Sequence, residues 1–485
     1  MARTLHIVVN PHAGHCDSLT VLRDEVEPLL VHHGNSSLLD IVRHQTQAKD
    51  DGRRIGAKIR AQADSSSPPF DSLAAQHQVD VVVVGGDGTT NEIINGFFAD
   101  DVLVTRSVPS ASTLAPTLHL IPVPTGSANA LYAACFPPSS AKEDQRVAPQ
   151  DTHKSTQHWS RAKSLRSFLA SLGLNLKKPS SDEGFQGTLA PLTLLVNDII
   201  PVPPSSEACQ RAQASSSSAT PVEVSSPERI LTHLVTSHAL HAAILHDSET
   251  PEMRQSFPGT ERFKKAFELN ATRWTYGQLR LHPLLTTGLV SQYQPSSKTF
   301  ETVSETVLQG PFVYLNALVT DRLEPHFVPA PFSSTFSTAS AQRHRVSAVD
   351  KAARQLQRPP EAVDLVIIRP HRDPNVKDAL DAASPGDRAL IMERAQADFL
   401  ATRLGGIIQA MYDGGKHVDL VYEDNQGTAA PIVEYLRTGG YSFDPAPEDE
   451  RASLICLDGV TIPSQKSEVS VWGSATGRGR AYVWT

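Results

Sequence analysis

Apolar and polar residues in the first 136 positions predict alternating strands and helices. Four short apolar runs are typical of strands: 5–9, 38–42, 80–84 and 118–123. The four valines at 81–84 predict a strand that is buried on both faces, as in a parallel sheet. Apolar residues at helical spacing predict a helix near 18–30, which Pro28 should kink or shorten, and the segment 48–63 predicts a charged, exposed helix. A doubly wound parallel sheet binds ligands at the carboxyl ends of its strands, so the loops there are the first candidates for a site.

The pattern changes after residue 136. A stretch rich in Pro, Ser, Gln and charge follows, and it predicts a flexible linker with one helix near 164–172. Beyond it, short apolar runs predict an antiparallel β-sandwich with one amphipathic helix near 389–411 and disordered insertions near 201–227 and 332–358. We expect an α/β plus all-β protein in three parts: a doubly wound parallel-sheet domain at 1–136, a flexible insertion at 137–187 and a β-sandwich domain at 188–485.

Composition narrows the expected partners and location. The 485 residues carry 44 Lys and Arg against 52 Asp and Glu, a net charge of −8 that gives no drive toward nucleic acid. Four widely spaced cysteines fit a reduced, cytoplasmic protein. No apolar run approaches the roughly twenty residues needed to span a bilayer, and the first residues do not resemble a signal peptide. We expect any membrane contact to be transient and peripheral, and the oligomeric state stays open.

The segment with the clearest chemistry follows the valine strand and has the sequence Gly85-Gly86-Asp87-Gly88-Thr89. Glycines allow backbone N–H groups to approach a ligand closely, and a strand, a glycine turn and a helix start form an arrangement that receives phosphate. Thr89 or the next threonine is the expected helix cap. A carboxylate beside a phosphate repels it unless a cation bridges the two or the carboxylate takes a proton, and both roles belong to phosphoryl transfer. A purely structural turn is the alternative, which Asp87 between the glycines makes less favoured.

Two further loops end predicted parallel strands, Asn10-Pro11-His12-Ala13-Gly14 and Pro124-Thr125-Gly126-Ser127-Ala128-Asn129. In a doubly wound sheet these loops and the glycine turn gather at one edge, where they could hold a triphosphate and its ribose. Asn10 by itself would be a simple turn residue. Four histidines near the N-terminus have no metal-ligand pattern, and solvated or core histidines explain them better.

The order and spacing of these three loops resemble the catalytic domain of the diacylglycerol kinase superfamily, with later motifs most similar to sphingosine kinases. The resemblance implies ATP and Mg²⁺ as cofactors and Asp87 as the catalytic base toward a lipid hydroxyl. It implies that the following residues bind nucleotide: Asn10, Pro11, His12, Gly85, Gly86, Gly88, Thr89, Glu92, Thr125, Gly126 and Ser127.

Residues of the second domain extend the resemblance. Arg254 and Arg262 match arginines that reach the ATP phosphates in sphingosine kinases, although exposed helix arginines with acidic neighbours are an equal alternative. The family's acidic residue for the lipid head aligns with Leu245, so the nearby Asp247 is the substrate-binding candidate. Asp458 and Gly459 match an Asp-Gly-Glu motif that is associated with nucleotide or metal.

The chain departs from the family pattern at two positions. Ala128 replaces a glycine, and Val460 replaces the acidic residue of Asp-Gly-Glu. Valine binds neither Mg²⁺ nor a proton, and no metal ligand is assigned from the sequence.

These patterns favour an ATP-dependent lipid kinase that phosphorylates the primary hydroxyl of a sphingoid long-chain base, or of a related lipid such as ceramide or diacylglycerol. The alternatives are a catalytically weak nucleotide- or lipid-binding protein of the same fold, which the two departures favour, and a dinucleotide kinase, which shares Gly-Gly-Asp-Gly.

Overall fold

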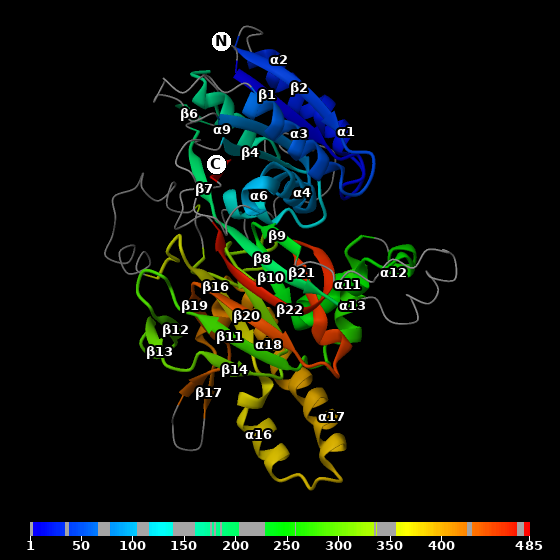
Figure 1. The fold of residues 1–485 in the computed structure, drawn as a ribbon, viewed down its shortest axis with the longest axis vertical. Helices are drawn as coiled ribbons and strands as arrows, with labels where there is room; N and C mark the ends of the chain where they lie inside the picture. Colours follow the sequence, from blue (N-terminus) through cyan, green and yellow to red (C-terminus); the bar gives the residue numbers. More distant parts are fainter. Residues whose placement is uncertain are drawn as a thin grey trace.

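The computed structural model contains a parallel-stranded α/β unit and a large antiparallel sheet that lies below it in Figure 1. It describes residues 3–33, 38–65, 78–103, 116–138, 161–174, 177–178, 181–184, 187–202, 228–257, 259–333, 336, 356–423, 429–472 and 480–485. Most of the expected insertions at 137–187, 201–227 and 332–358 lie outside the described residues. No helix in the described ranges is long and apolar enough to cross a membrane.

The first sheet has six strands in the order β2-β1-β3-β4-β23-β7. Its strands are β1 (Arg3–Val9), β2 (Leu39–Gln45), β3 (Gln78–Gly85), β4 (Thr117–Pro124), β7 (Leu189–Leu192) and β23 (Ala481–Trp484). All neighbours are parallel except β7 and β23. Val81 and Val83 face one core, and Val82 and Val84 face another on the opposite side, as the valine run predicts.

Helices cover both faces of this sheet. They are α1 (Ser18–Val21), α2 (Glu27–His33), α3 (Asp51–Ser65), α4 (Asp87–Phe97), α5 (Ala99–Leu103), α6 (Ala130–Cys135) and α9 (Lys163–Ser171). A π-helical segment, Leu22–Val26, connects α1 and α2 just before Pro28, so the expected irregularity lies one turn earlier. Helix α4 begins at Asp87 after the extended residue Gly86, without the expected threonine cap.

Three elements of this unit lie outside the range 1–136 that we expected to form it. Helix α9 packs on the sheet, where Ser164 Oγ donates a hydrogen bond of 2.7 Å to the carbonyl of Trp484. Strands β7 and β23, which we expected in the second domain, complete the parallel sheet instead. Both ends of the chain therefore lie in the upper part of Figure 1.

The second sheet has 13 strands within the described residues, and its neighbouring strands are antiparallel. They are β8 (Leu194–Pro201), β9 (Glu228–Thr232), β10 (Val235–His238), β11 (Gly277–His282), β12 (Val290–Gln294), β13 (Thr299–Val303), β14 (Val307–Gln309), β15 (Tyr314–Leu318), β16 (Val363–Ile368), β19 (Glu434–Thr438), β20 (Gly440–Pro445), β21 (Leu454–Leu457) and β22 (Val460–Trp472). The long strand β22 pairs with β21 and then with β8 and β20, so the expected two layers are hydrogen-bonded into one continuous sheet. Residues of β11 and β20 share a core with residues of β15 and β16.

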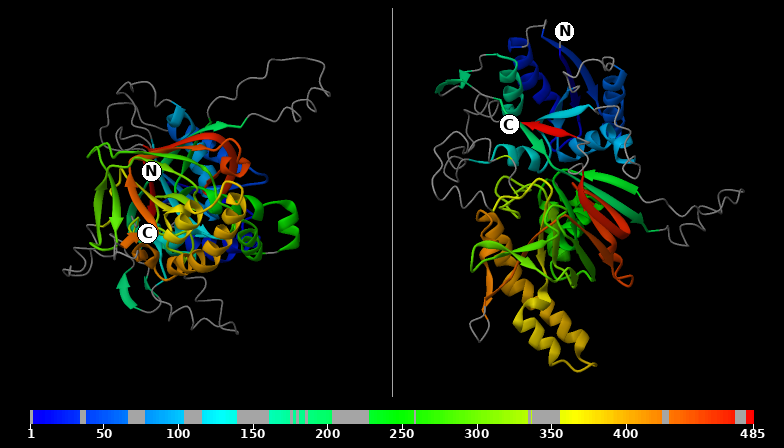
Figure 2. Two further views of the ribbon diagram at one scale, coloured as in Figure 1. Left: turned by 90° about the horizontal axis from the view of Figure 1, so that it is seen from below. Right: turned by 60° about the vertical axis from the view of Figure 1, so that its left-hand side comes forward.

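Two small hairpins and a set of helices complete the described fold, with the first hairpin in the upper part of Figure 1 and the helices on the second sheet. The hairpins are β5 (Lys177–Lys178) with β6 (Ser181–Gly184), and β17 (Val421–Glu423) with β18 (Ala429–Pro431). The helices are α11 (Ala239–Ser248), α12 (Pro251–Ser256), α13 (Glu261–Asn270), α16 (Pro374–Asp381), α17 (Arg388–Phe399) and α18 (Gly405–Tyr412), with a π-helical segment at Leu400–Leu404 and 3₁₀ turns at Pro370–Arg372, Lys416–Asp419 and Glu450–Ser453. Helices α16 and α17 project from the end of the molecule far from the parallel sheet (Figures 1 and 2).

Candidate functional site

The three predicted loops meet at the carboxyl edge of the parallel sheet. Asn10 Nδ2 donates a hydrogen bond of 2.8 Å to Thr89 Oγ1, which joins the loop after β1 to the glycine turn after β3. The backbone N–H of Thr125 donates to the carbonyl of Gly85 at 3.0 Å, which joins the loop after β4 to the same turn. These contacts follow from the strand order, because β3 lies between β1 and β4.

Glycine is required where these loops touch. A Cβ added to Gly86 would lie 2.9 Å from Gly126 Cα, and one added to Gly126 would lie 2.5 Å from Gly86 Cα. Gly14 has a φ of +51°, and its Cβ would lie 2.2 Å from the carbonyl oxygen of Thr125. At Gly88 a Cβ would meet nothing within 4 Å, so the outer side of the turn is open.

Asp87 points its carboxylate at the start of α6. It accepts hydrogen bonds from the backbone N–H groups of Ala130 at 2.6 Å and of Leu131 at 3.2 Å. Burial raises the pKa of this carboxyl group, while the charge of His233 and the two N–H donors act in the opposite direction. Asp87 therefore links the second and third loops, in addition to any role toward a ligand.

The outer surface of the loops carries small or polar groups. His12, Gly88, Ser127 and Ala128 are exposed, and Asn10, Pro11 and Gly126 are half-buried. Asn129 has a left-handed backbone with φ of 53°, and its side chain bonds both to the N–H of Gly126 at 2.8 Å and to its carbonyl at 2.7 Å. The loop after β4 is thus rigid before any ligand arrives.

Glu92 is the one α4 residue among the predicted set that points elsewhere. Its carboxylate accepts a hydrogen bond of 2.9 Å from the N–H of Gly52 at the start of α3. Burial raises the pKa of Glu92, and the hydrogen bond from Gly52 opposes this rise. The structure shows Glu92 as a link between α4 and α3, and its predicted nucleotide contact stays a prediction.

Asp458 and Gly459 form the two-residue turn between β21 and β22, with φ of 48° and 96°. The Asp458 carboxylate is fully buried and accepts hydrogen bonds from the N–H groups of His233, Leu234 and Val235, at 2.7, 3.0 and 2.9 Å. It also accepts one of 2.9 Å from Asn91 Nδ2 of α4. Asp458 therefore bonds the turn after β9 to α4, the helix of the glycine turn, and these residues form a seam between the two domains.

Two asparagines of α4 add further hydrogen bonds at this seam. Asn91 and Asn95 of α4 donate to the carbonyl of Leu231 at 2.8 and 2.9 Å, and the N–H of Leu231 donates to Asn95 Oδ1 at 2.8 Å. These asparagines, and His233, were not among the predicted site residues. Two asparagines four residues apart on an apolar helix are a signal that could have identified this contact.

The two predicted phosphate-binding arginines lie on α12 and α13, and both pair with Glu249. Arg254 Nε donates to Glu249 Oε2 at 2.9 Å, and Arg262 Nη2 donates to Glu249 Oε1 at 3.1 Å. The Arg254 side chain is 61% exposed and the Arg262 side chain 13%. In the described ranges no hydrogen bond or ion pair joins either arginine to the three loops, and their predicted phosphate contact stays a prediction.

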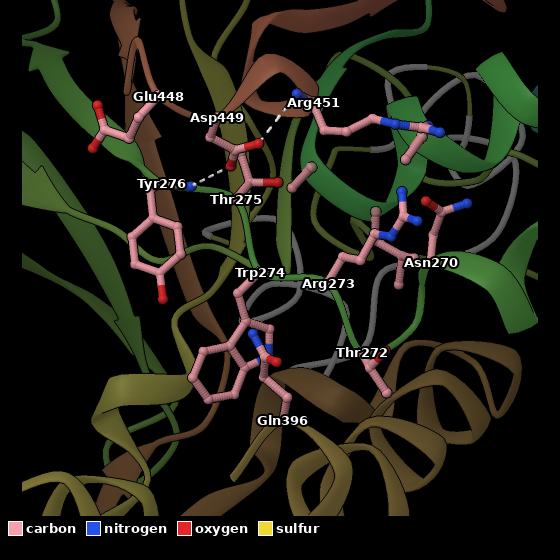
Figure 3. Close-up of a pocket in the computed structure, with 13 residues that line it drawn as sticks. Asn270, Thr272, Arg273, Trp274, Thr275, Tyr276, Gln396, Glu448, Asp449 and Arg451 are labelled. Carbon is pink, nitrogen blue, oxygen red and sulfur yellow. Dashed lines mark hydrogen bonds between the residues drawn. The ribbon is translucent and has the colours of Figure 1, made fainter. Parts of the chain in front are cut away.

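Asp247 lies at the end of α11 and is bonded to two residues that line a cavity of about 530 Å³. It accepts 2.8 Å hydrogen bonds from Asn270 Nδ2 and Arg451 Nη1. Partial burial would raise the pKa of Asp247, but the Asn270 and Arg451 donors hold it below its usual value. Figure 3 shows the cavity between Trp274, Gln396, Tyr276 and Arg451, with Asp449 bonded to the N–H groups of Tyr276 and Arg451. Asn270 Oδ1 and Trp274 Nε1 are buried there without a hydrogen-bond partner.

Val460 stands beside Asp458 at the start of β22, and its side chain is 39% exposed. No three His, Cys, Asp or Glu side chains within the described ranges lie close enough together to hold a metal ion. Within those ranges the side chains therefore form no metal site of their own. The edge of the sheet is open at Gly88, where an added Cβ would meet nothing within 4 Å, and nucleotide binding at this edge stays a prediction.

Part of the chain matches a known protein family. Residues 4–158 match the family described as the diacylglycerol kinase catalytic domain. The chain is similar in structure to a candidate diacylglycerol kinase from Bacillus anthracis str. Sterne, at 12% identity, a TM-score of 0.44, and coverage of 99% of this chain and 96% of the other. A second diacylglycerol kinase structure from that organism gives 12% identity, a TM-score of 0.40, and coverage of 97% and 93%. No curated protein sequence matches the chain.

Proposed function

We propose that this protein is an ATP-dependent lipid kinase. The observation that carries the proposal is the meeting of three strand-ending loops at one sheet edge, within the residues that match a diacylglycerol kinase catalytic domain. Backbone N–H groups, small side chains and open space at Gly88 suit the phosphates of ATP. The absence of a basic composition argues for a small phosphate ligand rather than for nucleic acid.

In the proposed reaction, Asp87 accepts the proton of a lipid hydroxyl while that oxygen forms its bond to the γ-phosphorus. The bond from the γ-phosphorus to the bridging oxygen breaks, and ADP leaves. Backbone N–H groups of the glycine turn stabilise the charge that develops on the phosphoryl oxygens. Mg²⁺, when bound with ATP, would neutralise phosphate charge, and no residue of this chain is assigned to hold it.

A sphingoid long-chain base is the acceptor that we propose first, with ceramide and diacylglycerol as related acceptors. The motifs around Arg254 and Arg262 support this choice, and Asp247 is proposed to act near the lipid head. Access to such a lipid implies transient contact with a membrane surface and location in the cytoplasm, which are part of the proposal.

A transfer assay tests the proposal. Purified protein is incubated with radiolabelled ATP, Mg²⁺ and micelles of a sphingoid base, ceramide or diacylglycerol, and labelled lipid is quantified. Asp87→Asn should abolish transfer, whereas Asp101→Asn, which removes an aspartate on the neighbouring helix α5, should leave it unchanged. An Asp87→Asn variant with full turnover would refute the role of Asp87. Transfer to a dinucleotide and to no lipid would replace the proposal by a dinucleotide kinase.

Two observations favour a second candidate, a nucleotide- or lipid-binding protein with weak catalysis. The Asp87 carboxylate is already bonded to two backbone N–H groups, and Val460 supplies no second acid. This candidate predicts ATP binding in calorimetry together with lipid labelling no higher than that of Asp87→Asn.

A further inference from the structure

The seam between the two domains contains a buried histidine that the proposed reaction does not use. His233 lies in the turn between β9 and β10, and its Nδ1 lies 2.6 Å from Asp458 Oδ2. Both side chains are 0% exposed. At this distance the ring and the carboxylate form a close buried pair, and Nε2 has no hydrogen-bond partner among the described residues.

Neutral donors and the His233 ring surround the Asp458 carboxylate. Three backbone N–H groups and Asn91 hold the carboxylate in place, and the charge of the His233 ring is the largest influence that favours its ionised form. An isolated buried carboxylate would be strongly unfavourable, so the ring completes the arrangement as an imidazolium.

Asp87 is the other acidic group that acts on this ring. The charges of Asp458 and Asp87 both favour the protonated ring, and the charge of His233 in turn favours the ionised form of Asp87. Asn91, which bonds to Asp458, lies one helical turn after Asp87 on α4, so the pair is attached to the helix that carries the proposed base.

We propose that His233 is a positioning residue for the phosphotransfer described above: its imidazolium, fixed by Asp458, keeps Asp87 in the carboxylate form that can accept a proton. The inference rests on the proposed function. The second domain then contributes to the reaction, because the charge of His233, in the turn between β9 and β10, controls the ionisation of Asp87 in the glycine turn.

The sign of the effect follows from the causes. Burial lowers the pKa of His233, but Asp458 and Asp87 outweigh burial and raise it. Burial and the nearby charge of Asp458 raise the pKa of Asp87, and the charge of His233 limits that rise. Loss of the imidazolium should therefore raise the pKa of Asp87 further, so a smaller fraction of the enzyme carries the base at a given pH.

His233→Asn tests this, because its amide can still donate to Asp458 while the positive charge is lost. The acidic limb of the pH profile of kcat/KM should move upward by about one to three pH units, the usual effect of a nearby opposite charge, with activity recovering at high pH. His238→Asn is the matched control: His238 is a buried histidine on the adjacent strand whose pKa burial lowers to about 3, and it contacts Tyr441 at 3.2 Å rather than a carboxylate. This control should keep the wild-type limb. Unchanged profiles in His233→Asn would overturn the inference.

A second measurement does not require turnover. In ¹⁵N-histidine-labelled protein, the two ring nitrogens of an imidazolium resonate close together and those of a neutral ring far apart. A resonance pair that is charged at pH 7.5 and absent in His233→Asn supports the inference, and a neutral His233 overturns it whether or not the protein is a kinase. A charged His233 in a chain that phosphorylates no lipid would instead remove the proposed function, and the role of His233 with it.

Discussion

Substitution of Asp458 by asparagine should be among the most damaging single changes to stability. The variant keeps an oxygen that can accept from the backbone N–H groups, but it loses the charge that pairs with His233 at 2.6 Å in a fully buried seam. Removing one partner of a buried ion pair typically lowers the free energy of unfolding by about 3–5 kcal/mol. Asp444→Asn is the control, because its pair with Lys466 is about half exposed and should contribute less than about 1 kcal/mol.

The loss should depend on pH. In the native protein the pKa of His233 is raised, so its contribution is fully present below the unfolded value of 6.5 and is lost as pH rises through the folded value. Without Asp458, burial favours the neutral form of the His233 ring. At low pH the ring is protonated in the unfolded chain and must lose that proton on folding, so it lowers the stability of the folded protein. Urea unfolding at pH 6 and pH 9, followed by circular dichroism, should show the larger destabilisation at pH 6. A loss below about 1 kcal/mol that is equal at both pH values would refute this reasoning.

Three further changes test other parts of the structure. Gly86→Ala should destabilise the protein by about 1–3 kcal/mol, since its methyl meets backbone, whereas Gly88→Ala enters open space and should be neutral or stabilising; thermal unfolding compares the two. Asn95→Ala should cost about 1–3 kcal/mol by leaving the buried N–H of Leu231 unpaired, while the carbonyl of Leu231 keeps its bond from Asn91; faster hydrogen exchange at 228–232 would reveal this. Because burial raises the pKa of Asp87, lipid phosphorylation should decline on the acidic side at a higher pH than an exposed aspartate would give, as a pH–rate profile would show.

The local sequence pattern was sufficient to predict the first four strands of the parallel sheet. The valine run, the flanking glycines and the alternation of strands and helices predicted β1 to β4 and the meeting of the three loops. This succeeded because a parallel sheet brings the ends of its strands to one edge whatever the details of packing. The match of residues 4–158 to a diacylglycerol kinase catalytic domain agrees with that prediction.

Long-range pairing was not accessible in the same way. Strand β23 joins β4 across more than 300 residues, as in the pairing of Ala481 with Leu118, and nothing in its apolar sequence distinguishes this sheet from the other. Two contacts of the site also depend on how side chains are placed in three dimensions. These are the pairing of both arginines with Glu249 and the hydrogen bonds that Asp87 accepts from the N–H groups at the start of α6. The Asp458-Gly459 dipeptide lies between two apolar runs, a pattern that predicts a two-residue hairpin turn. The family resemblance instead assigned these residues to nucleotide binding.

The most direct test of the account is whether ATP occupies the edge formed by the three loops. Hydrogen exchange with and without a non-hydrolysable ATP analogue and Mg²⁺ measures this for each backbone segment. The account predicts protection at residues 10–14, 85–89 and 124–129, and little change at 374–399, which contains α16 and α17. Protection that is absent from all three loops at saturating analogue would contradict the kinase proposal.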